Sequence, residues 1–160
     1  MVRPATQQVF TDLEFYLWRI RYAPDQEWHP EIMVMASEKT LYTMQEAVTS
    51  MITDFKQYGE STRKFLCNPP EDIDAQRYAK ENNAEIEWLI WLILRMHPES
   101  PPKTKYELKN KAVTVFLDEQ EASELLGIIG NQLNLRNSHF QGQAVPKGLY
   151  FTRDWLGAKK

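Results

Sequence analysis

The chain has 160 residues, of which 42% are hydrophobic and 26% charged, and its formal net charge is −3. This is the composition of an ordinary globular domain, and it excludes a disordered chain, a collagen-like chain and a small disulfide-rich domain. The charge is unevenly spread, because residues 134–160 hold five Lys and Arg and one Asp, a net +4 that leaves −7 for residues 1–133. We expect one domain over 1–160, with frayed residues 1–10 and a basic, aromatic C-terminal segment at 134–160.

Cysteine usage and hydropathy predict the compartment. The only cysteine, Cys67, has no partner for a disulfide within the chain, which is typical of a protein from a reducing compartment. The longest apolar run covers the seven residues 88–94, whereas a membrane-spanning helix needs about 20. The N-terminus lacks the apolar stretch of a signal peptide. We therefore expect a cytoplasmic protein that does not associate with membranes.

The first third of the chain predicts two strands followed by a long helix. Residues 13–22 alternate and are rich in aromatics, which favours a strand, and 32–35 predict a second strand after a loop with two prolines. Ser37 is a suitable N-cap and Gly59 a natural stop. Between these two residues, apolar side chains recur at helical spacing, at Leu41, Met44, Val48, Met51, Ile52 and Phe55.

The middle of the chain allows two interpretations. Residues 63–67 predict a strand, and 71–83 predict a short polar helix. Apolar residues then alternate strictly over 84–96, which favours a central strand that is buried on both faces. The alternative is one long helix over 71–97, because the periodicity of a short apolar run does not separate a strand from a helix.

The remaining elements repeat the plan of the first third of the chain. Residues 105–117 predict one long or bulged strand, and Asp118 with Glu121 has the spacing of a capping box before a second amphipathic helix. The apolar stripe of that helix consists of Ala122, Leu125, Leu126, Ile129 and Leu133, and a last strand is expected at 149–151.

The two halves suggest a duplication. Residues 13–57 and 85–134 both follow the order strand, proline-rich connection, strand, cap and amphipathic helix. Two such ββα units share one sheet naturally. We therefore predict an α+β fold, with one antiparallel sheet of about four to six strands and two amphipathic helices on one of its faces.

The sequence contains no recognisable catalytic or metal-binding motif. The histidines His29, His97 and His139 all fall in predicted connections, and no HExxH, CxxC or glycine-rich phosphate-binding pattern is present. Cys67 has no base nearby in the sequence, and we interpret it as a small buried hydrophobic residue. We therefore expect neither a metal nor a cofactor.

The C-terminal segment is the first candidate binding site. Basic and aromatic side chains alternate in it, a pattern that suits base stacking and phosphate contact in single-stranded nucleic acid as well as the centre of a protein interface. A third interpretation is that the aromatics complete the protein's own core while the bases stay in solvent. The residues are Lys147, Tyr150, Phe151, Arg153 and Trp155.

Small side chains on the second helix are the other candidate. Ser123, Gly127 and Gly130 lie along one side of it, and a glycine inside a helix costs about 0.8–1 kcal/mol relative to alanine. Close approach of another element would compensate this cost. The residues thus predict a subunit interface, packing against the first helix, or an early end of the second helix at Gly130.

These features give three functional hypotheses. The first is a non-catalytic binding or regulatory module that engages a protein partner or a second copy of itself. The second is a single-stranded nucleic-acid-binding protein that uses the C-terminal segment, which the negative net charge disfavours. The third is a small enzyme with a site assembled from distant loops, using His29, His97 or Glu85.

Overall fold

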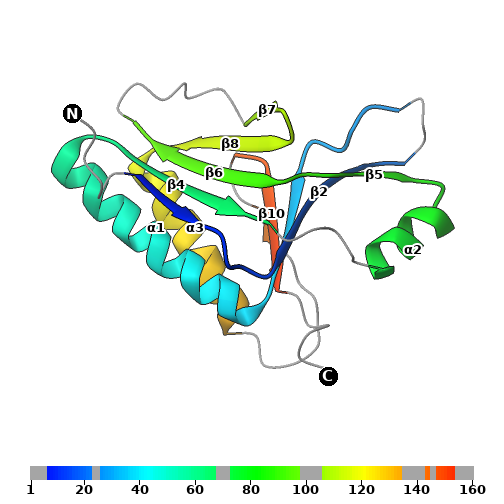
Figure 1. The fold of residues 1–160 in the computed structure, drawn as a ribbon, viewed down its shortest axis with the longest axis horizontal. Helices are drawn as coiled ribbons and strands as arrows, with labels where there is room; N and C mark the ends of the chain where they lie inside the picture. Colours follow the sequence, from blue (N-terminus) through cyan, green and yellow to red (C-terminus); the bar gives the residue numbers. More distant parts are fainter. Residues whose placement is uncertain are drawn as a thin grey trace.

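The computed structural model describes residues 7–22, 26–67, 73–97, 106–134, 143–144 and 147–153. The helices among these residues are α1 (Glu38–Tyr58), α2 (Ile73–Glu81) and α3 (Glu119–Leu133) (Figure 1). The strands are β1 (Gln7–Phe10), β2 (Phe15–Arg21), β3 (Ile32–Ala36), β4 (Ser61–Leu66), β5 (Glu85–Trp88), β6 (Trp91–Met96), β7 (Glu107–Lys109), β8 (Ala112–Leu117), β9 (Gln143–Ala144) and β10 (Leu149–Arg153).

These strands form two mixed sheets of five strands each, so the prediction of a single antiparallel sheet is wrong. Sheet A has the order β1-β4-β6-β8-β7, and sheet B has the order β5-β2-β3-β10-β9. In sheet A the pairs β1–β4 and β6–β8 are parallel. In sheet B the pair β3–β10 is parallel. Helix α1 contacts β4 and β6 of sheet A, and α3 contacts β8 of sheet A and β10 of sheet B. The two helices therefore do not lie on one face of a single sheet.

The error has a local cause at Leu89 and Ile90. The alternating stretch 84–96 is not one strand, because it leaves sheet B after β5 and enters sheet A as β6. The Leu89 N–H donates to the Leu17 carbonyl in sheet B at 2.8 Å, and the next N–H, of Ile90, donates to the Lys111 carbonyl at 2.8 Å. Two successive amides therefore bond to different sheets, the first to β2 of sheet B and the second to the turn between β7 and β8 of sheet A. Residues 73–97 thus form a helix followed by two strands, and the alternative of one long helix is excluded.

The predicted duplication is also wrong. Strands β2 and β3 are an antiparallel pair, whereas β6 and β8 pair in parallel. The expected long strand over 105–117 is in fact the hairpin β7–β8. Its two turn residues, Asn110 and Lys111, both have positive φ, 54° and 62°. Two adjacent positive φ values are typical of a type I′ turn, which suits the twist of a hairpin.

Helix α1 begins and ends, and α3 begins, where the predicted caps lie. The Ser37 side chain accepts a hydrogen bond from the Thr40 N–H, and Gly59 ends α1 with a φ of 84°. At the start of α3, the Asp118 carboxylate accepts from the Glu121 N–H at 2.7 Å, and the Glu121 carboxylate accepts from the Asp118 N–H at 3.0 Å. This is a complete capping box.

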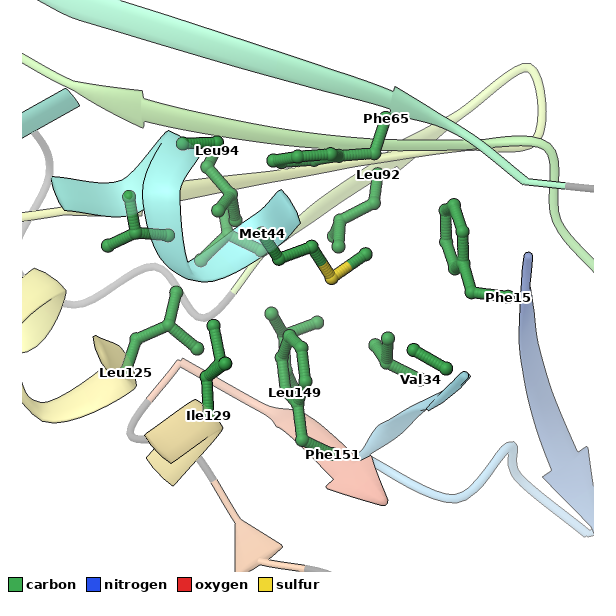
Figure 2. Packing of buried hydrophobic residues seen from close by; sticks show 14 of the residues in the cluster. Phe15, Val34, Met44, Phe65, Leu92, Leu94, Leu125, Ile129, Leu149 and Phe151 are labelled. Carbon is green, nitrogen blue, oxygen red and sulfur yellow. The ribbon is translucent and has the colours of Figure 1, made fainter. Parts of the chain in front are cut away.

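The main core lies where the inner faces of both sheets meet α1 and α3. Met44 of α1 is at its centre in Figure 2, with Phe65 of β4 on one side and Phe151 of β10 on the other. Side chains from sheet A, sheet B and both helices thus form one continuous cluster, which fixes the two sheets relative to each other. Figure 2 labels further members of it, namely Phe15, Val34, Leu92, Leu94, Leu125, Ile129 and Leu149.

The expected frayed segment is described only in part. Residues 7–10 form β1, which pairs in parallel with β4, and the Phe10 ring stacks on the Phe65 ring at 5.2 Å between centroids. Residues 1–6 lie outside the described residues. The single-domain organisation and the separate role of residues 134–160 stay predictions.

Candidate interaction surface

One face of sheet A is turned away from the helices. The strand register places alternate residues of the five strands on this side, because paired residues lie on the same face of a sheet. We call this surface the outer face of sheet A. Its residues are Gln7, Val9, Thr62, Lys64, Leu66, Trp91, Ile93, Arg95, Glu107, Lys109, Ala112, Thr114 and Phe116.

None of these residues is buried. Lys64 and Arg95 are exposed, and the apolar Trp91, Ile93 and Phe116 in the middle of the face are half-buried by their neighbours in the sheet. The Arg95 guanidinium lies over the Phe116 ring, 5.8 Å from its centroid. Apolar and aromatic area between exposed cations therefore remains available to a partner.

The outer face of sheet A is positively charged although the chain is acidic. Its cations are Lys64, Arg95 and Lys109, and its only acid is Glu107, a net +2 against −3 for the chain. Because the positive groups sit on one face, the acidic excess must lie on the other surfaces. This face thus attracts negative charge.

The outer face of sheet B differs, because part of it is covered. Trp18 and Ile20 of β2 are only 7% and 4% exposed there, and they form a second cluster with half-buried residues such as Trp88. Helix α2 contacts β5 beside them, and in Figure 1 it lies at the opposite end of the molecule from α1 and α3. Of the two outer faces, that of sheet A is therefore the more accessible.

The C-terminal residues predicted to bind lie mostly inside the protein. Lys147, Phe151 and Arg153 are buried, at 4%, 1% and 5% exposure, and Tyr150 is half-buried. Trp155 lies outside the described residues. The burial of Phe151 agrees with the interpretation that the aromatics complete the core, but the expectation that the bases stay in solvent is wrong for Lys147 and Arg153. What this segment binds stays a prediction.

The two buried cations of this segment both contact helical residues. The Lys147 ammonium is 3.5 Å from the Glu121 carboxylate of α3. The Arg153 side chain donates to the Leu133 carbonyl at 3.2 Å, and its backbone N–H donates to the Gln132 side chain at 3.0 Å. Arg153 thus joins β10 to α3, and Lys147, just before β10, contacts the same helix.

The small residues of α3 do not act as one surface. Ser123 and Gly127 are exposed, and no atom lies within 4 Å of a methyl group added at Gly127. Gly130 instead faces α1, since an added methyl group would lie 3.6 Å from the Gln45 amide nitrogen. Beside it, a shallow groove of about 390 Å³ is lined by Gln45, Glu46, Thr49, Ser50 and Leu126. Their role in a subunit interface stays a prediction.

The groups considered for catalysis lie apart. The His97 ring nitrogen is 3.9 Å from the Glu60 carboxylate, with 36% and 56% of these side chains exposed, so the pair is not enclosed in a cleft. The Nδ1 atom of His29 accepts the Glu31 N–H. Glu85 forms an ion pair with Arg21 at 2.7 Å. His139 lies outside the described residues.

Cys67 is in the core, as interpreted from the sequence. It is 9% exposed, and its thiol donates to the Leu89 carbonyl at 2.9 Å. Burial raises the pKa of the Cys67 thiol from 9.0 to about 11, against a smaller opposite effect of a backbone hydrogen bond. A thiol with this pKa is a poor nucleophile at neutral pH. Among the described residues, no group of three His, Cys, Asp or Glu side chains could hold a metal ion.

The sequence does contain a signal for the outer face of sheet A. Trp91, Ile93 and Arg95 alternate with the core residues of β6, and we assigned Trp91 and Ile93 to a second buried face because the middle of that stretch is apolar. The charges of Arg95 in β6 and of Lys64 in β4 are what mark a face that meets solvent.

Comparisons with known proteins add little to this geometry. No family model matches the chain, and a search of curated proteins finds no relative. Among solved structures, the chain is similar to Drosophila Suppressor of Fused, with 12% identity and a TM-score of 0.44 over 84% of this chain. The match covers 27% of that protein's chain. No helix of the described residues has the length and apolar character needed to cross a membrane.

Proposed function

We propose that this protein is a non-catalytic binding module that engages a protein partner through the outer face of sheet A. The observation that supports the proposal is the combination on one uncovered face of apolar area at Trp91, Ile93 and Phe116 with exposed cations at Lys64 and Arg95. A cytoplasmic location is part of the proposal, since the chain has a single cysteine.

The composition of this face suits a protein interface. Interfaces are rich in aromatic residues and arginine at their centre and carry a polar rim. Trp91 and Phe116 supply the aromatic area. Arg95 lies over the Phe116 ring and can at the same time pair with an acidic group of a partner. The net +2 of the face implies a partner surface with excess Asp or Glu around an apolar centre, because opposite charges favour encounter and register.

A double charge reversal on the exposed cations tests the proposal. The protein is immobilised and exposed to a lysate of its source cells, and the retained proteins are identified by mass spectrometry. We expect Lys64→Glu with Arg95→Glu to lose an acidic partner that the wild type retains. Lys39→Glu with Lys80→Glu, two exposed residues on α1 and α2, makes the same change in net charge and should retain it.

Two results would contradict the proposal. One is that the charge-reversed protein retains the same partners in the same amounts as the wild type. The other is that the wild type retains no protein above the level of an empty support.

A second candidate, binding of single-stranded nucleic acid, is favoured by one feature of the same face. Trp91 and Phe116 present rings for base stacking beside the cations Lys64, Arg95 and Lys109. The net charge of −3 weighs against it, since phosphate contact drives such binding. Fluorescence anisotropy with a labelled single-stranded oligonucleotide at low salt separates the two, because only nucleic-acid binding raises the anisotropy and weakens as salt is added.

A further inference from the structure

The four edges of the two sheets are not equally protected against pairing with another strand. Natural proteins protect an edge strand with charged residues, with very short strands or with a covering element, because its unpaired N–H and C=O groups bind other strands. Three edges here follow that rule. The strand β7 has Glu107 and Lys109 in three residues, β5 has Glu85 and Glu87 and contacts α2, and β9 has two residues.

The fourth edge, β1, carries no charged residue, and no strand among the described residues covers it. Its four residues, Gln7–Phe10, include no charge and no proline. Val9 is 57% exposed, more than any other large hydrophobic side chain among the described residues. Within the described part of the chain, β1 pairs only with β4, so its other edge meets no strand.

We propose that β1 pairs antiparallel with β1 of a second copy of this chain, joining two copies of sheet A into one continuous sheet. An uncharged edge is complementary to itself, whereas a charged edge would repel its own copy. The proposal goes beyond the sheet-face function above, since it pairs the backbone edge of β1 with a second copy, although Val9 also belongs to the outer face of sheet A.

The alternation of the strand restricts the register of this pair, and the exposure of Val9 selects one of the registers that remain. Residues directly opposite each other must lie on the same face of the joined sheet, and Val9 lies on the outer face while Phe10 lies on the inner face. A two-fold axis that passes through a residue satisfies this condition, and we place it at Val9, the most exposed apolar residue of the strand. It sets Val9 against Val9 of the second copy, and Gln8 against Phe10 of the second copy. The two exposed valines then cover each other.

The size of the contact predicts a weak dimer. Stable interfaces bury about 1,200–2,000 Å² in total, and a four-residue edge buries less than that. Sedimentation of the wild type should therefore shift from monomer towards dimer as its concentration rises to about 1 mM. Val9→Lys should reduce the association constant at least ten-fold. Tyr42→Lys, which changes a 50% exposed residue of α1, should leave it unchanged.

A cysteine substitution tests the register directly. Opposite residues of an antiparallel pair have Cα atoms about 4.5–5.5 Å apart, within the range that a disulfide bridges. Under oxidised glutathione, which takes up the two electrons and two protons of the two thiols, Val9→Cys should form a covalent dimer. Gln7→Cys should not, because its two copies are about 13 Å apart along the joined strands. The native Cys67 is buried and does not compete.

Three results would overturn the proposal. The first is a wild type that stays monomeric at every concentration in the sedimentation series. The second is a Val9→Lys variant, folded by circular dichroism, that associates like the wild type. The third is a Val9→Cys variant that forms no more covalent dimer than Gln7→Cys. A wild type that stays monomeric but still captures its partner would remove this proposal alone and leave the proposed function standing.

Discussion

Removal of the Asp54 carboxylate should destabilise the fold strongly, because it leaves a buried arginine without its counter-ion. The Arg63 side chain is fully buried beneath α1, and its Nη2 donates to Asp54 at 2.6 Å and to the Ser50 hydroxyl at 3.0 Å. Its Nη1 donates to the Thr62 carbonyl at 3.0 Å. In Asp54→Ala the two neutral acceptors remain, but the positive charge has no carboxylate.

The magnitude follows from the burial of each partner. Breaking a buried ion pair from one side typically costs about 3–5 kcal/mol. The Asp54 side chain is 14% exposed, so water can reach the site and the cost should lie at the lower end, about 3 kcal/mol. In Arg63→Met the buried charge itself is removed and the remaining carboxylate can hydrate. That variant should therefore lose less, on the order of 1 kcal/mol.

Urea unfolding followed by tryptophan fluorescence measures both variants. We expect Asp54→Ala to be less stable than Arg63→Met, and the double variant to resemble Arg63→Met, since the carboxylate has no role once the charge is gone. Lys56→Ala, which removes an exposed ion pair with Glu119 at 3.7 Å, should change the free energy of unfolding by less than about 0.5 kcal/mol. Equal stabilities of Asp54→Ala and wild type would refute the reasoning.

Four further predictions concern three residues. Gly127→Ala should stabilise the protein by about 0.5–1 kcal/mol in thermal unfolding, because the site is helical and open, and a lower melting temperature would contradict this. Gly148→Ala should destabilise it by at least about 1 kcal/mol, since Gly148 has a φ of 95° and an added methyl group would lie 3.1 Å from the Tyr106 ring; an unchanged melting temperature would show that the turn adapts. The native Cys67 thiol should react with a disulfide reagent at pH 8 about 100-fold more slowly than in guanidinium, as its pKa of about 11 lowers the thiolate fraction. Because its folded pKa lies above the ordinary value of 9.0, the stability that this thiol contributes is complete below pH 9 and is lost between about pH 9 and 11, so a Cys67→Ala variant should lack that part of the alkaline loss.

The helices could be predicted from sequence because their signals are local. Ser37 and Gly59 bound α1, and Asp118 with Glu121 caps α3, each within a few residues of the helix that it ends or begins. Such caps satisfy backbone groups that the helix itself leaves unpaired, so they need no information about the tertiary structure.

The sheets could not be predicted, because their order depends on contacts between distant residues. Leu89 and Ile90 continue the alternating pattern of their neighbours, and nothing in the pattern marks the point where the chain passes from sheet B to sheet A. The parallel pairing of β10 with β3 joins Leu149 to Ile32, far apart in the chain. The turn at Asn110 and Lys111 was missed since lysine seldom adopts a positive φ.

The sequence predicted the residue types of the candidate site but not its location. We expected basic and aromatic side chains to act together, but at the C-terminal segment. There, Phe151 and Arg153 are buried by α3 and the core, whereas the outer face of sheet A presents the same residue types at Trp91 and Arg95. The charges of Lys64 and Arg95 are a signal in the sequence, but only the strand register shows that they share a face with Trp91.

The central claim, that the outer face of sheet A is a binding surface, is tested most directly by the affinity of the captured partner. Isothermal titration calorimetry should give a Kd at least about ten-fold weaker, about 1.4 kcal/mol, for Lys64→Glu with Arg95→Glu than for the wild type. Lys39→Glu with Lys80→Glu should match the wild type. Equal affinities for all three proteins would place the binding surface elsewhere and contradict the claim.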